Sequence, residues 1–215
     1  MNEYVRRLPI YLLIDTSGSM MGEPIEAVKQ GIRTLITELK GDPQAVETAY
    51  LSVITFDSHA RQLVPLTELM KFSEPEFSAS GATALGEALL VMLDCIKKEV
   101  RKNTDVHKGD WRPFVFILTD GSPTDTEAFS RAVDAVRNAD IGNIIACAAG
   151  AKVKIEPLKR ITKNVLIMNT ISAGDFSNFF EWVSGSIKMT SKSMVLNNAD
   201  NGIENPVPQG FVIVS

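Results

Sequence analysis

Short apolar runs alternate with longer stretches of mixed polarity along the chain. Six runs of four to seven residues are wholly or largely apolar and end at turn-forming residues, a pattern typical of buried strands. The predicted strands cover residues 8–14, 50–56, 60–66, 114–119, 144–149 and 165–168. Between the runs, apolar residues repeat at three- and four-residue spacing, which predicts amphipathic helices. The predicted helices, the fourth of them short, cover residues 24–40, 83–102, 124–138, 157–161 and 175–190.

This order of elements predicts an α/β fold. We expect a doubly wound, mostly parallel, six-stranded sheet with helices on both faces. The link between the runs at 50–56 and 60–66 is too short for a helical crossover, so these two should form an antiparallel hairpin. The polar side chains of Arg61 and Gln62 suit an edge position, which gives the sheet one antiparallel edge strand.

The C-terminal part of the chain has a different character. A polar break at residues 197–202 separates it from the predicted helices, and we assign residues 1–192 to the domain and 193–215 to a tail. The apolar residues 211–214 leave two alternatives open. They form one more strand, on a sheet edge of this chain or of a partner, or they are a frayed terminus.

Local signals support the ends of two helices. Pro24 fits the first helical turn, where its missing N–H costs nothing, and Gly41 is a natural C-terminal stop. Thr124 and Glu127 match a capping box, so we predict that Thr124 is the N-cap of the helix at 124–138.

Composition narrows the class of protein. The 215 residues are 45% apolar, an ordinary globular value, and carry a net charge of −4. Such a chain lacks the basic footprint of nucleic-acid binding, so we expect no nucleic-acid partner. No apolar run approaches the ~20 residues of a membrane-spanning helix, and we expect no membrane span and a cytoplasmic location. Cys95 and Cys147 lie in apolar patterns and are expected to be buried free thiols.

Candidate chemistry gathers where two predicted strands end. The first apolar run leads directly into Asp15, and the most hydrophobic run leads into Asp120, each followed by a turn rich in glycine and serine. In doubly wound sheets, ligands bind at the carboxyl ends of strands where the strand order reverses. If these strands are neighbours there, the two acids converge, and Thr83 at a helix start could join them. Carboxylate and hydroxyl oxygens are the hard ligands that Mg²⁺ prefers.

The residues Asp15, Ser17 and Ser19, followed by Thr83 and then Asp120, resemble the metal-ion-dependent adhesion site (MIDAS) of von Willebrand factor A domains. The family pattern is Asp-x-Ser-x-Ser, then Thr, then Asp, and all five positions match in order. The resemblance implies a Rossmann-like fold in which Ser17 and Ser19 ligate Mg²⁺ through their hydroxyls, with Mn²⁺ or Ca²⁺ as substitutes. Thr83 would ligate directly or through water, and Asp15 and Asp120 would hold coordinating waters or bind directly.

The same resemblance implies a partner and a setting. One coordination position would stay open for an Asp or Glu of a protein partner, which makes the chain a binding module and not an enzyme. The stretch from Asp15 to Pro24 and the stretch from Thr119 to Asp125 are most similar to stand-alone bacterial family members associated with tellurite resistance. That similarity implies a bacterial stress-response system with a phosphatase or kinase as partner.

Other interpretations remain at this point. Taken singly, Ser17, Ser19 and Thr83 could be helix caps, and Asp15 could stabilise a tight turn. A Mg²⁺-dependent phosphatase-like enzyme is the alternative function, although such enzymes need a second Asp where this chain has Ser17. No phosphate-binding glycine loop follows the first strand.

Four further polar residues are expected to lie outside the set of five. We expect Asp125 to lie near a helix cap, Asp57 to be at most a neighbour of the site, and His59 and His107 to be surface residues.

Overall fold

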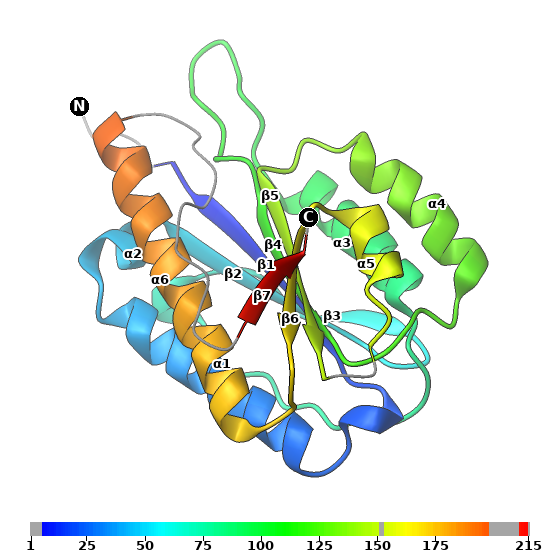
Figure 1. Cartoon of the computed structure of the whole chain (residues 1–215). Coiled ribbons are helices and arrows are strands. Elements are labelled where there is room, and N and C mark those ends of the chain that lie inside the picture. The colour runs from blue at the N-terminus through cyan, green and yellow to red at the C-terminus, as the bar shows by residue number, and fades with distance from the viewer. Residues whose placement is uncertain (1–5, 151–152, 198–210, 215) are drawn as a thin grey trace.

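The computed structural model describes residues 6–150, 153–197 and 211–214 (Figure 1). Within them the chain forms one seven-stranded sheet in the order β3-β2-β1-β4-β5-β6-β7. The strands are β1 (Leu8–Asp15), β2 (Ala49–Phe56), β3 (Ala60–Glu68), β4 (Phe114–Thr119), β5 (Asn143–Ala149), β6 (Asn164–Met168) and β7 (Phe211–Val214). The five inner strands are parallel, and β3 and β7 are antiparallel to their neighbours, one at each edge.

Helices cover both faces of this sheet. Figure 1 shows α1, α2 and α6 on one face and α3, α4 and α5 on the other. The α-helices are α1 (Glu23–Lys40), α2 (Pro43–Thr48), α3 (Leu85–Glu99), α4 (Thr126–Arg137), α5 (Glu156–Ile161) and α6 (Ala173–Asn197), and two 3₁₀ turns are η1 (Gly18–Met20) and η2 (Leu69–Lys71). The doubly wound α/β architecture predicted from the sequence is therefore confirmed.

Strand β1 is buried along its whole length because both faces of the sheet are covered. Successive side chains of a strand point to opposite faces. Leu12 and Ile14 accordingly join the core beneath α1 and α6, whereas Tyr11 and Leu13 join the core beneath α3 and α4. Two cores thus share one central strand, which explains why its sequence is continuously apolar.

Helices α1 and α6 approach each other closely at a glycine. A β-carbon placed on Gly31 of α1 would lie 2.1 Å from the Phe180 ring of α6. Gly31 therefore forms the notch that receives this aromatic ring. Both residues are buried, and the contact fixes the position of α6 along α1.

The structure decides between the two alternatives for residues 211–214, an extra strand or a frayed terminus. They form β7, which pairs with β6 in antiparallel register, so the predicted six-stranded sheet gains a seventh strand and a second antiparallel edge. Phe211 stacks on Phe179 of α6 with ring centroids 6.4 Å apart, which gives the short strand an apolar anchor. The part of the predicted polar break at 198–202 lies outside the described residues.

Several predicted helix boundaries were wrong. The helix predicted over 83–102 is shorter, because α3 begins at Leu85 and ends at Glu99. The helix predicted over 175–190 is longer, and α6 continues across residue 192 to Asn197. The six-residue helix α2 was not predicted, although Asp42 is a good N-cap and accepts hydrogen bonds from the amides of Gln44 and Ala45.

The predicted capping box at Thr124 was also wrong. Helix α4 begins at Thr126 with Asp125 as its N-cap residue. The hydroxyl of Thr124 instead donates to the carbonyl of Thr83 at 3.1 Å, so a tertiary contact replaces the local cap.

The strand order shows where in the fold the residues of the predicted site lie. Strand β1 lies between β2 and β4, and the chain continues from β1 toward one edge and from β4 toward the other. The strand order therefore reverses at β1 and β4, as expected. Asp15 ends β1, and Asp120 directly follows β4, so both lie at the carboxyl edge of this reversal.

Candidate metal centre

Asp15 is the buried anchor of the candidate site. It has no exposed surface, and its Oδ1 accepts a 2.8 Å hydrogen bond from the amide of Ser17. Its Oδ2 accepts a short hydrogen bond from the hydroxyl of Thr119 at the end of β4. Burial raises the pKa of Asp15 to about 6, and the hydrogen bonds from Thr119 and Ser17 oppose that rise.

A chain of oxygen atoms continues from the turn after β1 to the turn after β4. The Oγ atoms of Ser17 and Ser19 lie 3.1 Å apart, and the hydroxyl of Ser19 donates to Asp120 Oδ1 at 2.7 Å. Burial also raises the pKa of Asp120. Three of the residues predicted from the sequence are therefore linked to one another directly.

Thr83 lies near the same oxygen atoms, with Gly121 between its hydroxyl and Asp15. A β-carbon placed on Gly121 would lie 3.1 Å from Thr83 Oγ1 and 3.8 Å from Asp15 Oδ2. The missing side chain at Gly121 thus leaves the space between the threonine hydroxyl and the buried carboxylate open. The structure brings all five predicted site residues to one place.

The turn that carries Thr83 is held to the sheet by the backbone. The amide of Gly18 donates to the carbonyl of Gly81 at 3.0 Å, and the amide of Ser80 donates to the carbonyl of Thr16 at 2.8 Å. Gly81 has a φ of +74°, which favours glycine, and a β-carbon there would lie 2.4 Å from Ser58 Oγ. Glycine is therefore needed at position 81, where any larger residue would be strained and would collide with Ser58 in the turn between β2 and β3.

The donor set fits a hard divalent cation. It consists of two carboxylates and three hydroxyls, with no nitrogen or sulfur among them. Within the described residues, neither Asp15 nor Asp120 forms an ion pair with a basic side chain, although burial disfavours the charge of both. No three His, Cys, Asp or Glu side chains cluster anywhere in the described ranges, so a metal held here would depend on the hydroxyls.

Three contributing residues were not predicted as part of the site. Thr119 holds the Asp15 carboxylate, and the hydroxyl of Thr124 bridges to the backbone of Thr83, accepting from its amide at 3.2 Å. Asp125 accepts hydrogen bonds from the amides of Gly86 and Glu87 at 3.1 and 2.7 Å, at the start of α3. A hydroxyl or carboxylate near a strand end is the only sequence signal for such roles.

Asp125 caps α3 from the neighbouring segment, so replacing it should loosen the start of that helix. We expect Asp125→Ala to lower the free energy of unfolding by about 1 kcal/mol, the usual cost of losing a helix cap. Urea unfolding measures this value. Asp94→Ala is the matched control, because Asp94 is an exposed acid on the same helix whose partner is Lys98. Equal losses in the two variants would contradict the capping role.

The other polar residues considered from the sequence lie outside the set of five. Asp57 binds Arg61 with an Oδ2–Nη2 distance of 3.0 Å, and its Oδ1 accepts from the amide of His59. The side chain of His59 is 81% exposed and His107 is exposed, as predicted. Two free, buried cysteines are also present, as predicted.

Across the described ranges, no helix combines the length and apolarity that crossing a lipid bilayer requires.

Comparison with known proteins gives relatives of two kinds. The uncharacterized protein sll0103 of Synechocystis sp. is 32% identical over 127 residues, which are 56% of this chain and 27% of that protein. The chain therefore spans about a quarter of the length of this relative.

Solved structures show the same fold at low sequence identity. A von Willebrand factor type A protein from Catenulispora acidiphila superposes with a TM-score of 0.64 at 16% identity, covering 85% of this chain and 43% of that chain. Proximal thread matrix protein 1 from the mussel byssus, in a structure with a zinc-occupied MIDAS motif, gives a TM-score of 0.59 at 19% identity, covering 87% and 46%.

One family profile matches most of the chain. The profile of the von Willebrand factor type A domain aligns with residues 10–182, from the central strand β1 to the middle of α6. This range contains β1 from Ile10 onward and the whole of β2 to β6, together with all five residues of the candidate site. The chain therefore belongs to the von Willebrand factor type A domain family.

Proposed function

We propose that this chain is a Mg²⁺-dependent protein-binding module, with Asp15, Ser17, Ser19, Thr83 and Asp120 as the metal site. Metal-dependent protein interaction is the general role of the family to which it belongs. The observation that carries the proposal is the single cluster of these five oxygen-bearing side chains at the reversal of strand order. A neighbour of the same fold has zinc in the corresponding motif, which supports divalent-metal binding here.

The chemistry of the site supports a role in binding a partner's carboxylate. The three hydroxyls are neutral donors, and Mg²⁺ strongly prefers oxygen ligands in octahedral geometry. Asp15 is held in the interior by Ser17 and Thr119, so it cannot turn outward to fill a further position. Ser19 is exposed, so one side of the site faces solvent. An Asp or Glu of a partner would approach from that side.

The finer setting rests on the sequence resemblance alone. We infer a cytoplasmic role in a bacterial tellurite or stress-response system, with a phosphatase or kinase of that system as the partner. The alternative, a Mg²⁺-dependent phosphatase-like enzyme, has less support, because the position two residues after Asp15 carries Ser17 in place of a second acid.

Metal dependence of partner capture is the direct test. Immobilised wild-type chain in Mg²⁺ should retain a specific protein from bacterial lysate, release it into EDTA, and bind it again when Mg²⁺ is restored. Asp15→Ala should capture none of it while keeping the wild-type circular dichroism spectrum. Mutation of a single Asp or Glu of the captured protein should then abolish binding.

Two outcomes would contradict the proposal. One is capture that EDTA and Asp15→Ala leave unchanged. The other is Mg²⁺-dependent phosphatase turnover that Asp15→Asn abolishes, which would favour the enzyme.

A further inference from the structure

A small polar pocket lies beside the candidate metal centre, and we refer to it as the Thr16 pocket. It has a volume of about 220 Å³, and its walls include Thr16, Thr55, Asp57, Arg61, Glu76 and Ser80. Thr16 stands between the site residues Asp15 and Ser17 in the chain, so the pocket and the metal centre adjoin. A water molecule takes up about 30 Å³ in the liquid, so the pocket can hold the end of a long side chain.

Two nearly buried threonines that line this pocket have hydroxyls without a described protein partner. Thr16 is 1% exposed and Thr55 is 3% exposed, yet the hydroxyl of neither makes a hydrogen bond to any described residue. Among the described residues, every side-chain oxygen that is fully enclosed has a hydrogen-bond partner. Because these two hydroxyls have none, they are not fully enclosed, and the small exposed area of each threonine must include its hydroxyl. Both threonines line the pocket, and we take their hydroxyls as the groups that meet a guest. Buried polar groups of this kind are costly unless something hydrogen-bonds to them.

The charge of the pocket is negative because one acid has no close ion-pair partner. Asp57 is engaged by Arg61 and by the amide of His59. Glu76 makes no hydrogen bond or ion pair with any described residue. One carboxylate without a close ion pair thus lines the pocket together with the two threonines.

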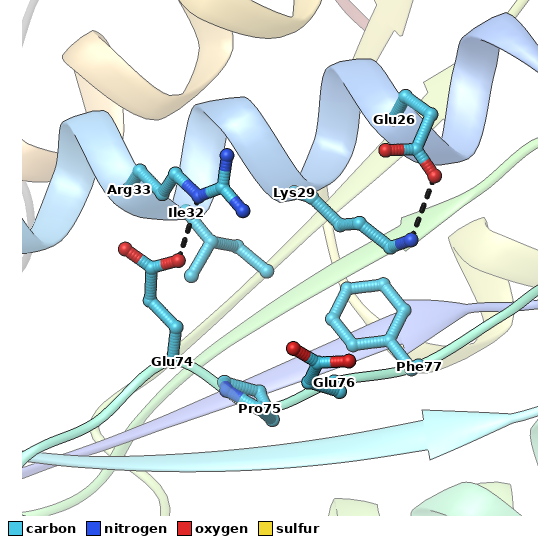
Figure 2. Close-up of a pocket in the computed structure, with 8 residues that line it drawn as sticks. All are labelled: Glu26, Lys29, Ile32, Arg33, Glu74, Pro75, Glu76 and Phe77. Carbon is cyan, nitrogen blue, oxygen red and sulfur yellow. Dashed lines mark hydrogen bonds and ion pairs between the residues drawn. The ribbon is translucent and has the colours of Figure 1, made fainter.

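The ion pairs in a neighbouring groove show which acids near Glu76 already have basic partners. In Figure 2 the segment carrying Glu74 and Glu76 runs alongside α1. Glu74 pairs with Arg33 at 2.7 Å and Glu26 pairs with Lys29 at 2.7 Å, so each basic residue of α1 that lines this groove already has an acidic partner. Glu76 lines both this groove and the Thr16 pocket, and among the acids lining them it is the one that forms no close ion pair, although it attracts Arg33 electrostatically.

We propose that the Thr16 pocket binds the ammonium or guanidinium group of a basic residue of the same partner whose acid reaches the metal. This inference rests on the proposed function and specifies the partner further, as a surface with an acidic and a basic residue close together. Glu76 would supply the charge, and the hydroxyls of Thr16 and Thr55 would accept hydrogen bonds from the guest. A second divalent cation fits less well, because Arg61 already stands in the pocket and only one carboxylate there is without a close ion pair.

The pocket can be tested without the metal and without the natural partner. The probe is acetyl-arginine methylamide, and its neutral match is acetyl-citrulline methylamide, each titrated into ¹⁵N-labelled full chain in EDTA. The arginine probe should shift the amide signals of Thr16 and Ser80 and bind about threefold or more tightly than citrulline, as expected for one exposed ion pair. That preference should weaken as salt rises.

Two variants locate the effect and separate it from metal binding. Glu76→Gln should remove the preference for arginine, and Glu74→Gln, a change of the same charge on the same segment, should keep it. Asp15→Asn, which should not bind Mg²⁺, should also keep the preference for arginine. The binding of arginine in the pocket and the binding of Mg²⁺ at the metal site can therefore be refuted independently. Equal affinity for the two probes, equal losses in both glutamate variants, or Ca²⁺-induced shifts of the same amides in Asp15→Asn would overturn the proposal.

Discussion

Asp15→Asn is expected to abolish Mg²⁺ binding and yet make the metal-free protein more stable than the wild type. The carboxylate is fully buried without a described ion-pair partner, and burial raises its pKa to about 6 from an ordinary value of 3.8. A shift of about two units corresponds to about 3 kcal/mol of destabilisation at neutral pH. Asparagine removes the charge and keeps an acceptor for the amide of Ser17. Urea unfolding in EDTA and calorimetric titration with Mg²⁺ measure the two effects.

The pH dependence provides the internal control. Because the folded state binds the Asp15 proton more tightly than the unfolded state, metal-free wild type should gain stability as the pH falls from about 7 to 4. Asp15→Asn should lose most of that gain, and the affinity of wild type for Mg²⁺ should fall below pH 6. Asp57→Asn, which changes an acid already paired with Arg61, should bind Mg²⁺ normally. A metal-free Asp15→Asn protein less stable than wild type at pH 7 would contradict this account.

Gly86→Ala is expected to cause the largest loss of stability among conservative changes near the site. A β-carbon on Gly86 would lie 2.1 Å from the backbone nitrogen and 2.5 Å from the Cα of Phe129 in α4. Backbone atoms cannot move aside as a flexible side chain can, so α3 and α4 must separate. We expect the free energy of unfolding to fall by about 3 kcal/mol, the upper part of the usual range for overpacking. Thermal and urea unfolding measure the loss.

The same displacement should weaken Mg²⁺ binding. Thr83 lies just before α3, and Asp120 lies in the segment that leads to α4, so separating the helices pulls the two apart. Gly41→Ala is the matched control, because its β-carbon would lie no closer than 3.5 Å to any atom and its φ of −79° suits alanine. That variant should be neutral or slightly stabilised. A Gly86→Ala protein as stable as Gly41→Ala would show that the helix contact yields easily.

The sheet and the convergence of Asp15 and Asp120 could be predicted because their signals are local or repeated, whereas the full set of five candidate ligands rested on the family resemblance. Strand β1 is apolar on both faces, which marks a covered central strand. Asp15 ends this strand, and Asp120 directly follows the similarly apolar β4. The convergence of the two acids then follows from parallel pairing of β1 with β4, a general property of doubly wound sheets.

The parts that could not be predicted depend on contacts between distant segments. Thr124 matches a local capping box, but its hydroxyl binds the backbone of Thr83, 41 residues away, and Asp125 caps α3 in place of α4. The status of residues 211–214 depended on β6 and Phe179, which no local pattern identifies. The Thr16 pocket depends likewise on how the segment around Glu76 lies against β1 and β2.

The metal site joins a buried central strand to a stretch of chain without regular secondary structure. Asp15 ends a strand that is buried throughout and paired on both sides, whose amides should exchange with solvent only when the whole domain unfolds. Thr83 lies near the end of a stretch, residues 72–84, without helix or strand. Ligation of both would restrain that stretch, at an entropic cost that lowers metal affinity. A partner that binds the same stretch would already have restrained it, so the metal would then bind without that loss of entropy. Metal and partner would therefore each strengthen the binding of the other.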